Sequence, residues 1–187
     1  MYTALWTCLD KSGHDACRIS RIADGWSIEG TAVFCHQGDV ASLSYCLVCD
    51  DRWCSQSALV KGWVGGKNIE ISISQEPGRG WSINGLHDEA FEGLLDIDLG
   101  FTPASNTNAL RRLNLTESQT ASSIAVWLDT EDWKVKKLPQ EYARTGPNTY
   151  DYSSPMHGYQ ATLRTTDFGI VSEYPGLWRM LNHIDAG

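Results

Sequence analysis

The sequence has few basic residues and no long apolar run, and both absences limit what the protein can do. Fifteen Lys and Arg residues stand against 23 Asp and Glu residues, which gives a formal net charge of −8. This balance argues against a nucleic-acid partner, because neutralisation of phosphates by basic side chains supplies most of that affinity. It also argues against adhesion to an anionic membrane. No stretch approaches the roughly 20 apolar residues of a membrane span, so stable membrane insertion is not expected.

The N-terminal segment lacks the features of a secretory signal. Residues 1–8 contain neither a basic leader nor a long apolar core. We therefore expect a cytoplasmic protein whose six cysteines are free thiols. Cys46 and Cys49 match C-x-x-C, but they lie in an alternating apolar run, where residues three apart point to opposite faces. That geometry suits neither a zinc site nor a redox motif, so we predict no metal and no cofactor.

The sequence motifs of several common enzyme classes are also missing. None of the five histidines has a second histidine two or four residues away, so no metal-binding motif is present. A G-x-S-x-G elbow, a phosphate-binding loop and a dinucleotide-binding glycine pattern are absent as well. These absences favour a protein that is not an enzyme and has no catalytic residues.

What the sequence does contain is alternation with a period of two. Apolar residues recur at every second position in residues 41–47, 69–74 and 124–128. Such runs are typical of half-buried strands, and one-sided alternation favours an antiparallel sheet. Helical periodicity is scarce, and the tail 176–184 is the best candidate for a short helix. No linker divides the chain, so residues 1–187 are expected to form a single all-β domain with little helix.

The number of strands has a consequence for the interior. Seventeen glycines, many within turn signals, fit ten or more short strands. Such a set must curl into a barrel or pack as a sandwich. A barrel well above eight strands encloses more space than its own side chains usually fill. The strand count therefore predicts a ligand cavity if the sheet forms a barrel.

One segment, residues 94–115, carries most of the polar signal. Asp96 and Asp98 share one face of an expected strand, and a polar loop then leads to Arg111 and Arg112. On a strand the two arginines would point to opposite faces, so one of them could meet the aspartates across a hairpin. The group is either a salt-bridged surface pair or a polar cluster at the mouth of a cavity. Carboxylates and arginine suit sugar hydroxyls or a phosphate head group.

Eight tryptophans supply a second signal. Tryptophan combines a large apolar body with one donor and stacks well on sugar rings. Ordinary core packing explains most of the eight. Trp53, Trp81 and Trp133 lie beside turn signals and are the best candidates for the rim of a cavity.

Several parts of the chain resemble one family. The matching residues are the acidic strand at 96–98, Thr102-Pro103, Asn106-Thr107, Arg111-Arg112-Leu113, Trp81 with Gly85, Asp129, Gly169-Ile170-Val171 and Tyr174-Pro175. Together they are similar to the signature of a family of bacterial proteins named for glycolipid binding. The chain departs from that signature at Asn108 and Ala109, where the family has an apolar residue and a proline.

The resemblance implies a large, strongly curved antiparallel sheet that forms a barrel or half-barrel, similar to bacterial lipoprotein carriers. It also implies non-enzymatic binding of an amphipathic ligand, a lipid or glycolipid, in the cavity of that barrel. The acyl chains would lie among Phe34, Leu43, Tyr45, Ile71 and Val126. The predicted ligand-binding residues are Asp96, Asp98, Asn106, Arg111, Arg112 and Trp81.

Two other functions stay open at this point. A glycoside hydrolase could use Asp96 and Asp98, whose α-carbons would lie about 6.6–6.8 Å apart on one strand, within the range of known carboxylate pairs. However, neighbours on one strand face point in parallel and do not flank a bond. An interaction module with a solid core and no small ligand is the other alternative.

Overall fold

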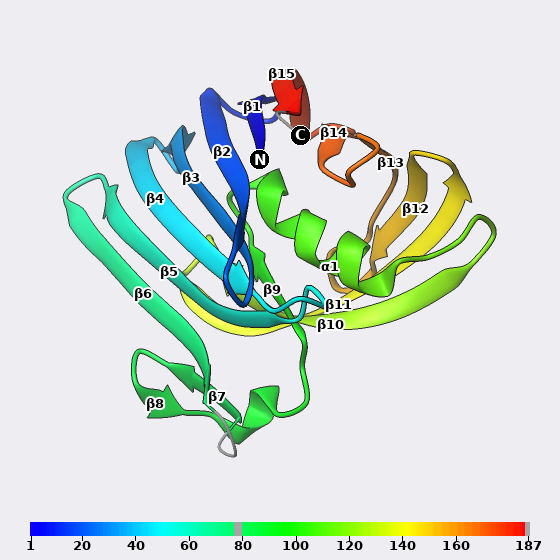
Figure 1. The fold of residues 1–187 in the computed structure, drawn as a ribbon. Helices are drawn as coiled ribbons and strands as arrows, with labels where there is room; N and C mark the ends of the chain where they lie inside the picture. The colour runs from blue at the N-terminus through cyan, green and yellow to red at the C-terminus, as the bar shows by residue number, and fades with distance from the viewer. Residues whose placement is uncertain (77–79, 186–187) are drawn as a thin grey trace.

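The computed structural model describes residues 1–187 except 77–79 and 186–187. Alternating apolar residues and glycine-containing turns produce a long run of strands in the first half of the chain (Figure 1). These strands are β1 (Tyr2–Cys8), β2 (Gly13–Ile22), β3 (Gly25–His36), β4 (Asp39–Cys49), β5 (Ser55–Val64), β6 (Lys67–Glu76), β7 (Gly80–Ile83) and β8 (Leu86–His87).

The described residues that follow β8 add seven strands and the short helices. The helices are η1 (Glu89–Phe91), η2 (Pro103–Ser105), α1 (Asn106–Leu113) and η3 (Pro155–His157). The strands are β9 (Asp96–Leu99), β10 (Thr120–Asp129), β11 (Lys134–Gly146), β12 (Thr149–Ser154), β13 (Tyr159–Thr165), β14 (Val171–Tyr174) and β15 (Trp178–Asp185). None of the helices in the described residues has the length and apolar character needed to span a membrane.

All described strands belong to one sheet, in the order β8-β7-β6-β5-β4-β3-β2-β1-β15-β14-β13-β12-β11-β10-β9. The first and last strands, β1 and β15, are therefore neighbours inside the sheet, and β8 and β9 are its two edges. Residues 88–95 connect these two edges. Eight residues reach about 30 Å when extended, whereas a flat sheet of this size would be about 65 Å wide. The sheet must curl, and the prediction of a strongly curved all-β sheet is confirmed (Figure 1).

Strand β9, at one edge of the curled sheet, lies against the start of β5 without pairing with it in a ladder. The backbone N–H of Ser55, at the start of β5, donates to the carbonyl oxygen of Leu95 at 2.8 Å. The Ser55 hydroxyl accepts hydrogen bonds from the backbone N–H of Ile97 and from Nδ2 of Asn108, each at 3.0 Å. Ser55 therefore links β5 to both β9 and α1.

Three details differ from the sequence-based expectations. β9 pairs with β10 in parallel, so the sheet is not antiparallel throughout. The tail expected to be helical forms β15, which pairs with β1 from Tyr2–Asp185 to Cys8–Trp178. The polar loop at 102–108 is the start of η2 and α1. In the last two cases tertiary packing overrides the weak local preference.

The concave side of the sheet is filled mainly by the chain itself. The segment 101–113 crosses it, with α1 lying inside the curve (Figure 1), and every residue from 101 to 110 is buried. Phe101 packs in a large core formed with β1–β6, whereas Leu110 packs in a smaller core with Tyr142 of β11. The interior is therefore not the large empty space expected from the number of strands.

A buried polar cluster fastens this segment to the first half of the sheet. The Tyr45 hydroxyl lies 2.9 Å from Oδ2 of Asp15 and 3.2 Å from the Thr102 hydroxyl. Thr102 also donates to Asp15, and it caps η2 by accepting from the N–H of Ala104 at 3.0 Å. A Cβ at Gly30 would lie 2.4 Å from the Tyr45 hydroxyl, so only glycine lets this ring lie across β3 and reach Asp15.

Candidate functional site

Alternation along β9 separates its two aspartates from the large core. Ile97 and Leu99 pack in that core, and Asp96 and Asp98 have the opposite parity. Asp96 is 1% exposed, and Arg112 binds it with two hydrogen bonds, Nε to Oδ1 at 2.6 Å and Nη2 to Oδ2 at 2.5 Å. The Ser123 hydroxyl of β10 also donates to this carboxylate. Asp96 is thus fully occupied in joining β9, α1 and β10.

Asp98 has a different environment from Asp96. Its carboxylate accepts a hydrogen bond from Nε2 of Gln140 at 2.7 Å, and the Ser105 hydroxyl lies 3.5 Å away. Burial raises the pKa of Asp98 to about 6, against the lowering effect of these hydrogen bonds, and the nearby Asp96 raises it further. A perturbed carboxylate at the edge of a hollow marks a candidate functional site.

Asp98 faces a hollow of about 210 Å³ on the concave side of the sheet, which we call the inner cavity. Aromatic side chains dominate its wall. The residues that define the inner cavity are Asp98, Gly100, Thr102, Pro103, Asn106, Trp127, Leu138, Tyr152, Ser154, His157, Tyr159, Tyr174, Leu177 and Trp178.

The aromatic wall is held together by ring contacts and hydrogen bonds. The Tyr152 and Tyr174 rings lie 5.6 Å apart edge to face, and the Tyr159 and Tyr174 rings lie 5.5 Å apart. The Tyr159 hydroxyl donates to the carbonyl oxygen of Pro175 at 2.5 Å. The Tyr152 hydroxyl accepts a hydrogen bond from Gln140 at 3.1 Å. Gln140 therefore hydrogen-bonds both to Asp98 and to a residue of the aromatic wall. These contacts fix the shape of the inner cavity.

Trp127 forms a further part of the wall, next to the turn that follows β9. A Cβ at Gly100 would lie 2.7 Å from Nε1 of Trp127, so the absence of a side chain at residue 100 leaves room for the indole. The exposed His157 meets Trp127 edge to face at 5.0 Å. The Ser154 hydroxyl is buried in the same wall, next to the Tyr152 hydroxyl on which it acts.

The other predicted site residues lie at varying distances from the inner cavity. Asn106 lines it, with Nδ2 3.4 Å from the Tyr142 hydroxyl. Arg111 points away from the aspartates and donates to the carbonyl oxygen of Phe168 at 3.2 Å. Trp81 is fully buried elsewhere and donates to the carbonyl oxygen of Leu94 at 3.0 Å. Of the six predicted residues, Asp98 and Asn106 line the inner cavity, and Asp96 and Arg112 support the strand that carries Asp98.

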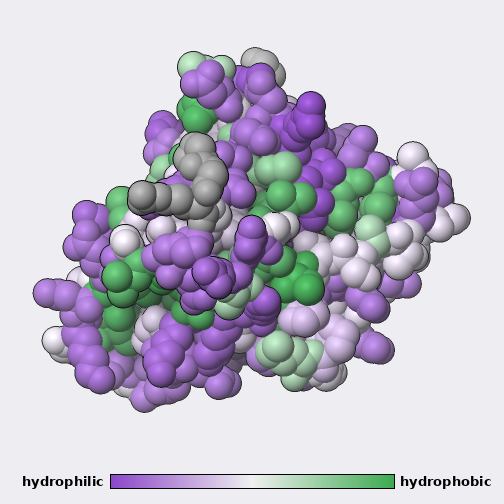
Figure 2. Space-filling view, turned by 90° about the horizontal axis from the view of Figure 1, so that it is seen from below, coloured by the Kyte–Doolittle hydropathy of each residue, from purple (hydrophilic) through white to green (hydrophobic). Residues whose placement is uncertain are grey.

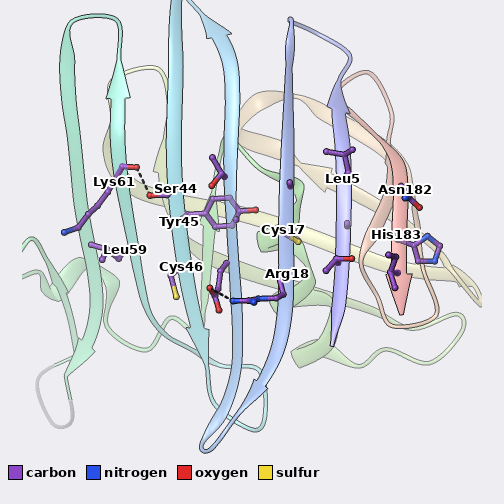
Figure 3. A pocket seen from close by; sticks show the side chains of 17 residues that line it. Leu5, Cys17, Arg18, Ser44, Tyr45, Cys46, Leu59, Lys61, Asn182 and His183 are labelled. Atoms are coloured by element: carbon purple, nitrogen blue, oxygen red, sulfur yellow. Dashed lines mark hydrogen bonds and ion pairs between the residues drawn. The ribbon is translucent and has the colours of Figure 1, made fainter. Parts of the chain in front are cut away.

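A larger hollow lies on the opposite, outer face of the sheet (Figure 3). This outer groove of about 840 Å³ crosses β15 and β1–β5, between Leu5 and Leu59. Its charged side chains already have partners: Arg18 with Glu29 at 3.1 Å, and Lys61 with a glutamate of β6 at 2.8 Å. We favour the inner cavity as the functional site, because it combines convergent polar groups with a perturbed carboxylate.

The rest of the surface is mixed in character. Seen from below, polar side chains surround separate apolar areas (Figure 2), as on most soluble proteins. Of the three tryptophans proposed for a rim, Trp53 and Trp81 are buried and Trp133 is half-buried. None of these three lines the inner cavity.

The residues expected to enclose acyl chains belong to the packed core. Phe34, Leu43, Ile71 and Val126 are buried there and do not line the inner cavity. The Phe101 ring from the central segment lies 6.2 Å from the Phe34 ring and occupies part of the space that a chain would need. The prediction therefore placed the acyl chains of the ligand in a region that the protein's own side chains fill.

The arrangement does not form a glycosidase-type carboxylate pair or a metal site in the described residues. Asp98 lines the inner cavity, but Asp96 is bound by Arg112 and does not. A glycoside hydrolase needs both carboxylates on either side of one bond. In the part of the chain that the structure describes, no three His, Cys, Asp or Glu side chains are grouped to hold a metal ion.

Sequence reasoning missed much of the inner cavity and the buried cluster. Gln140, Tyr152 and Trp127 lie on three strands, and the register between strands decides that they meet Asp98. Asp15 also stayed unnoticed, although a lone acidic residue in line with the buried positions Cys17 and Ile19 could have indicated an inward carboxyl.

Comparisons with known proteins agree with this architecture. A family model described as "Putative glycolipid-binding" matches residues 3–180. The crystal structure of a DUF1089 family protein from Pseudomonas aeruginosa is similar to 88% of this chain and 91% of that chain, with 26% identity and a TM-score of 0.77. A beta-barrel-like protein of domain of unknown function DUF1849 from Brucella abortus covers 97% of this chain and 96% of its own, with 10% identity and a TM-score of 0.53, which indicates a shared fold. No curated protein matches the sequence at a significant level.

Proposed function

We propose that this chain, which belongs to the family described as "Putative glycolipid-binding", binds an amphipathic ligand, a lipid or glycolipid, and holds its head group in the inner cavity. The observation that carries the proposal is the Asp98 carboxylate, which faces a hollow walled by aromatic rings. Aromatic faces stack on sugar rings and apolar groups, and a half-buried carboxylate such as Asp98 accepts strong hydrogen bonds from a polar head group.

The volume of the inner cavity limits how much of the ligand it can hold. At about 210 Å³ it is smaller than the roughly 300–1,000 Å³ of pockets that enclose drug-sized molecules. It therefore suits one small head group, with the acyl chains outside it. Asp98 and Asn106 contact the head group in this proposal, and Asp96 and Arg112 hold β9 and α1 in place. We expect binding without catalysis or cofactor, in the cytoplasm and without a nucleic-acid partner.

The test is lipid uptake by delipidated protein, measured by native mass spectrometry with a lipid extract and with octyl glucoside. Trp127→Ala removes part of the wall and is expected to weaken binding by about tenfold. Trp63→Ala is the matched control, because Trp63 is 43% exposed and lines neither the inner cavity nor the outer groove. It should leave binding unchanged.

A third variant separates the two hollows. Leu59→Ser alters the outer groove and leaves the inner cavity intact. If Leu59→Ser abolished binding and Trp127→Ala had no effect, the ligand would lie in the outer groove and the proposed site would be wrong. Absence of any lipid uptake by the wild-type protein would reject the function itself.

A further inference from the structure

The chemistry of the inner cavity carries information about the charge of its ligand. The two side chains that donate hydrogen bonds to Asp98, Gln140 and Ser105, are both neutral. His157 is the one residue of the described cavity wall that can carry a positive charge, and it is exposed. An ionised Asp98 is therefore not balanced by an ion pair within the described residues.

Two basic side chains on the neighbouring elements are paired with other carboxylates. Arg112 of α1 pairs with Asp96 at 2.5 Å. Lys136 of β11 lies opposite Trp127 in the strand register. It pairs with Asp129 at 2.6 Å and with Asp132 at 3.0 Å. Neither cation lines the inner cavity. These two cations therefore do not balance the charge of Asp98.

The other titratable groups around Asp98 are acidic or phenolic. Asp96 lies on the same strand face and raises the pKa of Asp98, while burial is the main cause of its rise to about 6. In turn, Asp98 contributes to raising the pKa of Tyr152 to about 12, where burial is again the main cause. Asp98 is thus mostly ionised at neutral pH, in surroundings that penalise its charge.

The aromatic wall is suited to the same kind of partner. The faces of Trp and Tyr rings attract cations, and aromatic cages are the usual sites for substituted ammonium groups. Trp127, Tyr152, Tyr159 and Tyr174 all line the inner cavity together with Asp98. A carboxylate combined with several aromatic rings favours a cation over a neutral polyol, because both elements gain from positive charge.

We propose that the head group held in the inner cavity carries an ammonium group, which pairs with Asp98 and lies against the aromatic wall. The inference rests on the proposed function. It identifies the ligand as an amphiphile with a cationic head, either an amino sugar or an alkylammonium of the choline type.

The experiment compares three amphiphiles with the same octyl chain, each below its critical micelle concentration, by calorimetry. They are octyl glucoside, its 2-amino-2-deoxy counterpart and octyltrimethylammonium. We expect at least one of the two cationic compounds to bind about tenfold or more tightly than octyl glucoside. The cationic compound that binds more tightly shows whether the natural head group is an amino sugar or a choline-type ammonium.

The Asp98→Asn variant tests the role of the carboxylate. It should remove the preference for the cationic head, so that the cationic compounds bind no more tightly than octyl glucoside. Asp151→Asn is the control, since Asp151 is exposed and bonded to Thr162 on β13. Should Asp98→Asn fail to fold, the pH dependence of wild-type binding serves instead. Affinity for the cationic compound should fall as the pH is lowered through about 6, the pKa of Asp98.

Two results would overturn the inference in distinguishable ways. Equal binding of the neutral and cationic compounds, unchanged by Asp98→Asn, would reject the ammonium group and leave the proposed function standing. Binding of none of the three compounds and of no lipid would reject the proposed function, and the inference with it.

Discussion

At the residue scale, the half-buried Arg112 and the buried Asp96 form an ion pair whose loss should be costly. Arg112→Met keeps the apolar stem but leaves Asp96, which is 1% exposed, without its cation. Breaking such a pair destabilises a protein by about 3–5 kcal/mol. We expect a loss of this size in the free energy of unfolding, measured by urea denaturation.

The matched control for this variant is Arg18→Met. Arg18 pairs with Glu29 at 3.1 Å on the outer face, where both side chains are exposed. Exposed pairs contribute about 0–1 kcal/mol. Equal effects of the two substitutions would show that the Arg112–Asp96 pair is no more important than a surface contact.

Asp15 should make stability depend on pH. Burial raises its pKa from 3.8 to about 7, although Thr102 and Tyr45 donate to it. Between these two values the folded protein binds more protons than the unfolded chain, so stability falls as the pH rises from about 4 to 7. The Asp98 carboxyl acts in the same direction up to about pH 6. The melting temperature should therefore be lower at pH 8 than at pH 5.

Asp15→Asn tests this assignment, because the amide does not titrate in this range. The variant should show a flatter profile of melting temperature against pH, with only the part due to Asp98 remaining. Asp151→Asn, at an exposed position, should keep the wild-type profile. An unchanged slope in Asp15→Asn would contradict the assignment.

At the scale of single elements, the turn between β9 and η2 controls the position of Trp127. A Cβ at Gly100 would lie 2.7 Å from its Nε1 and 2.8 Å from the carbonyl oxygen of Leu128. Gly100→Ala should therefore displace the indole or the strand end, and weaken ligand binding by about tenfold, in line with removal of an aromatic anchor.

The control for this steric argument is Gly66→Ala. A Cβ at Gly66 would meet nothing within 4 Å, so this variant should bind ligand as the wild type does. Calorimetry gives the affinity of each variant, and tryptophan fluorescence reports the movement of the indole. A Gly100→Ala protein with normal affinity would show that the position of Trp127 does not matter.

Comparison of the predicted and observed elements shows which local sequence patterns were sufficient to predict secondary structure. The runs 41–47, 69–74 and 124–128 were predicted as strands and lie in β4, β6 and β10, because their alternation matches a sheet with one buried face. The prediction of a helix in the tail was wrong. Leu177, Met180 and Leu181 have helical spacing, but pairing with β1 decides the conformation of this segment. Helix α1 was missed because its eight residues are mostly polar, and no local pattern shows that five of them are buried inside the sheet.

At the scale of the whole molecule, the sequence predicted the class of fold and one side of the site. Asp98 and Asn106 could be identified because both lie in the polar segment that the resemblance also covers. The wall opposite them could not, because it depends on how strands distant in sequence are aligned. The filling of the interior by residues 101–113 was equally inaccessible, since no local pattern indicates that a polar helix is enclosed.

The contact of β9 and α1 with β5 depends on Ser55, which is fully buried. Ser55→Ala removes the acceptor for the N–H of Ile97 and for Asn108, both in buried surroundings. Leaving buried donors unpaired costs about 1–3 kcal/mol. We expect a loss of this size in chemical denaturation, and faster amide exchange at Ile97. Ser57→Ala, at a half-buried position of the same strand, is the control and should change neither quantity.

The pairing of β1 with β15 has a consequence for synthesis of the protein. Strands β1–β6 follow one another as neighbours, so they can pair in the order in which the ribosome releases them. The second edge of β1, however, stays unsatisfied until the final strand emerges. A nascent or prematurely terminated polypeptide would carry an open β-edge, the surface most prone to intermolecular association. Rapid completion of translation, or a chaperone that shields this edge, should therefore reduce aggregation of this protein. The effect should be larger than for a fold in which the first strand pairs only with strands close to it in sequence.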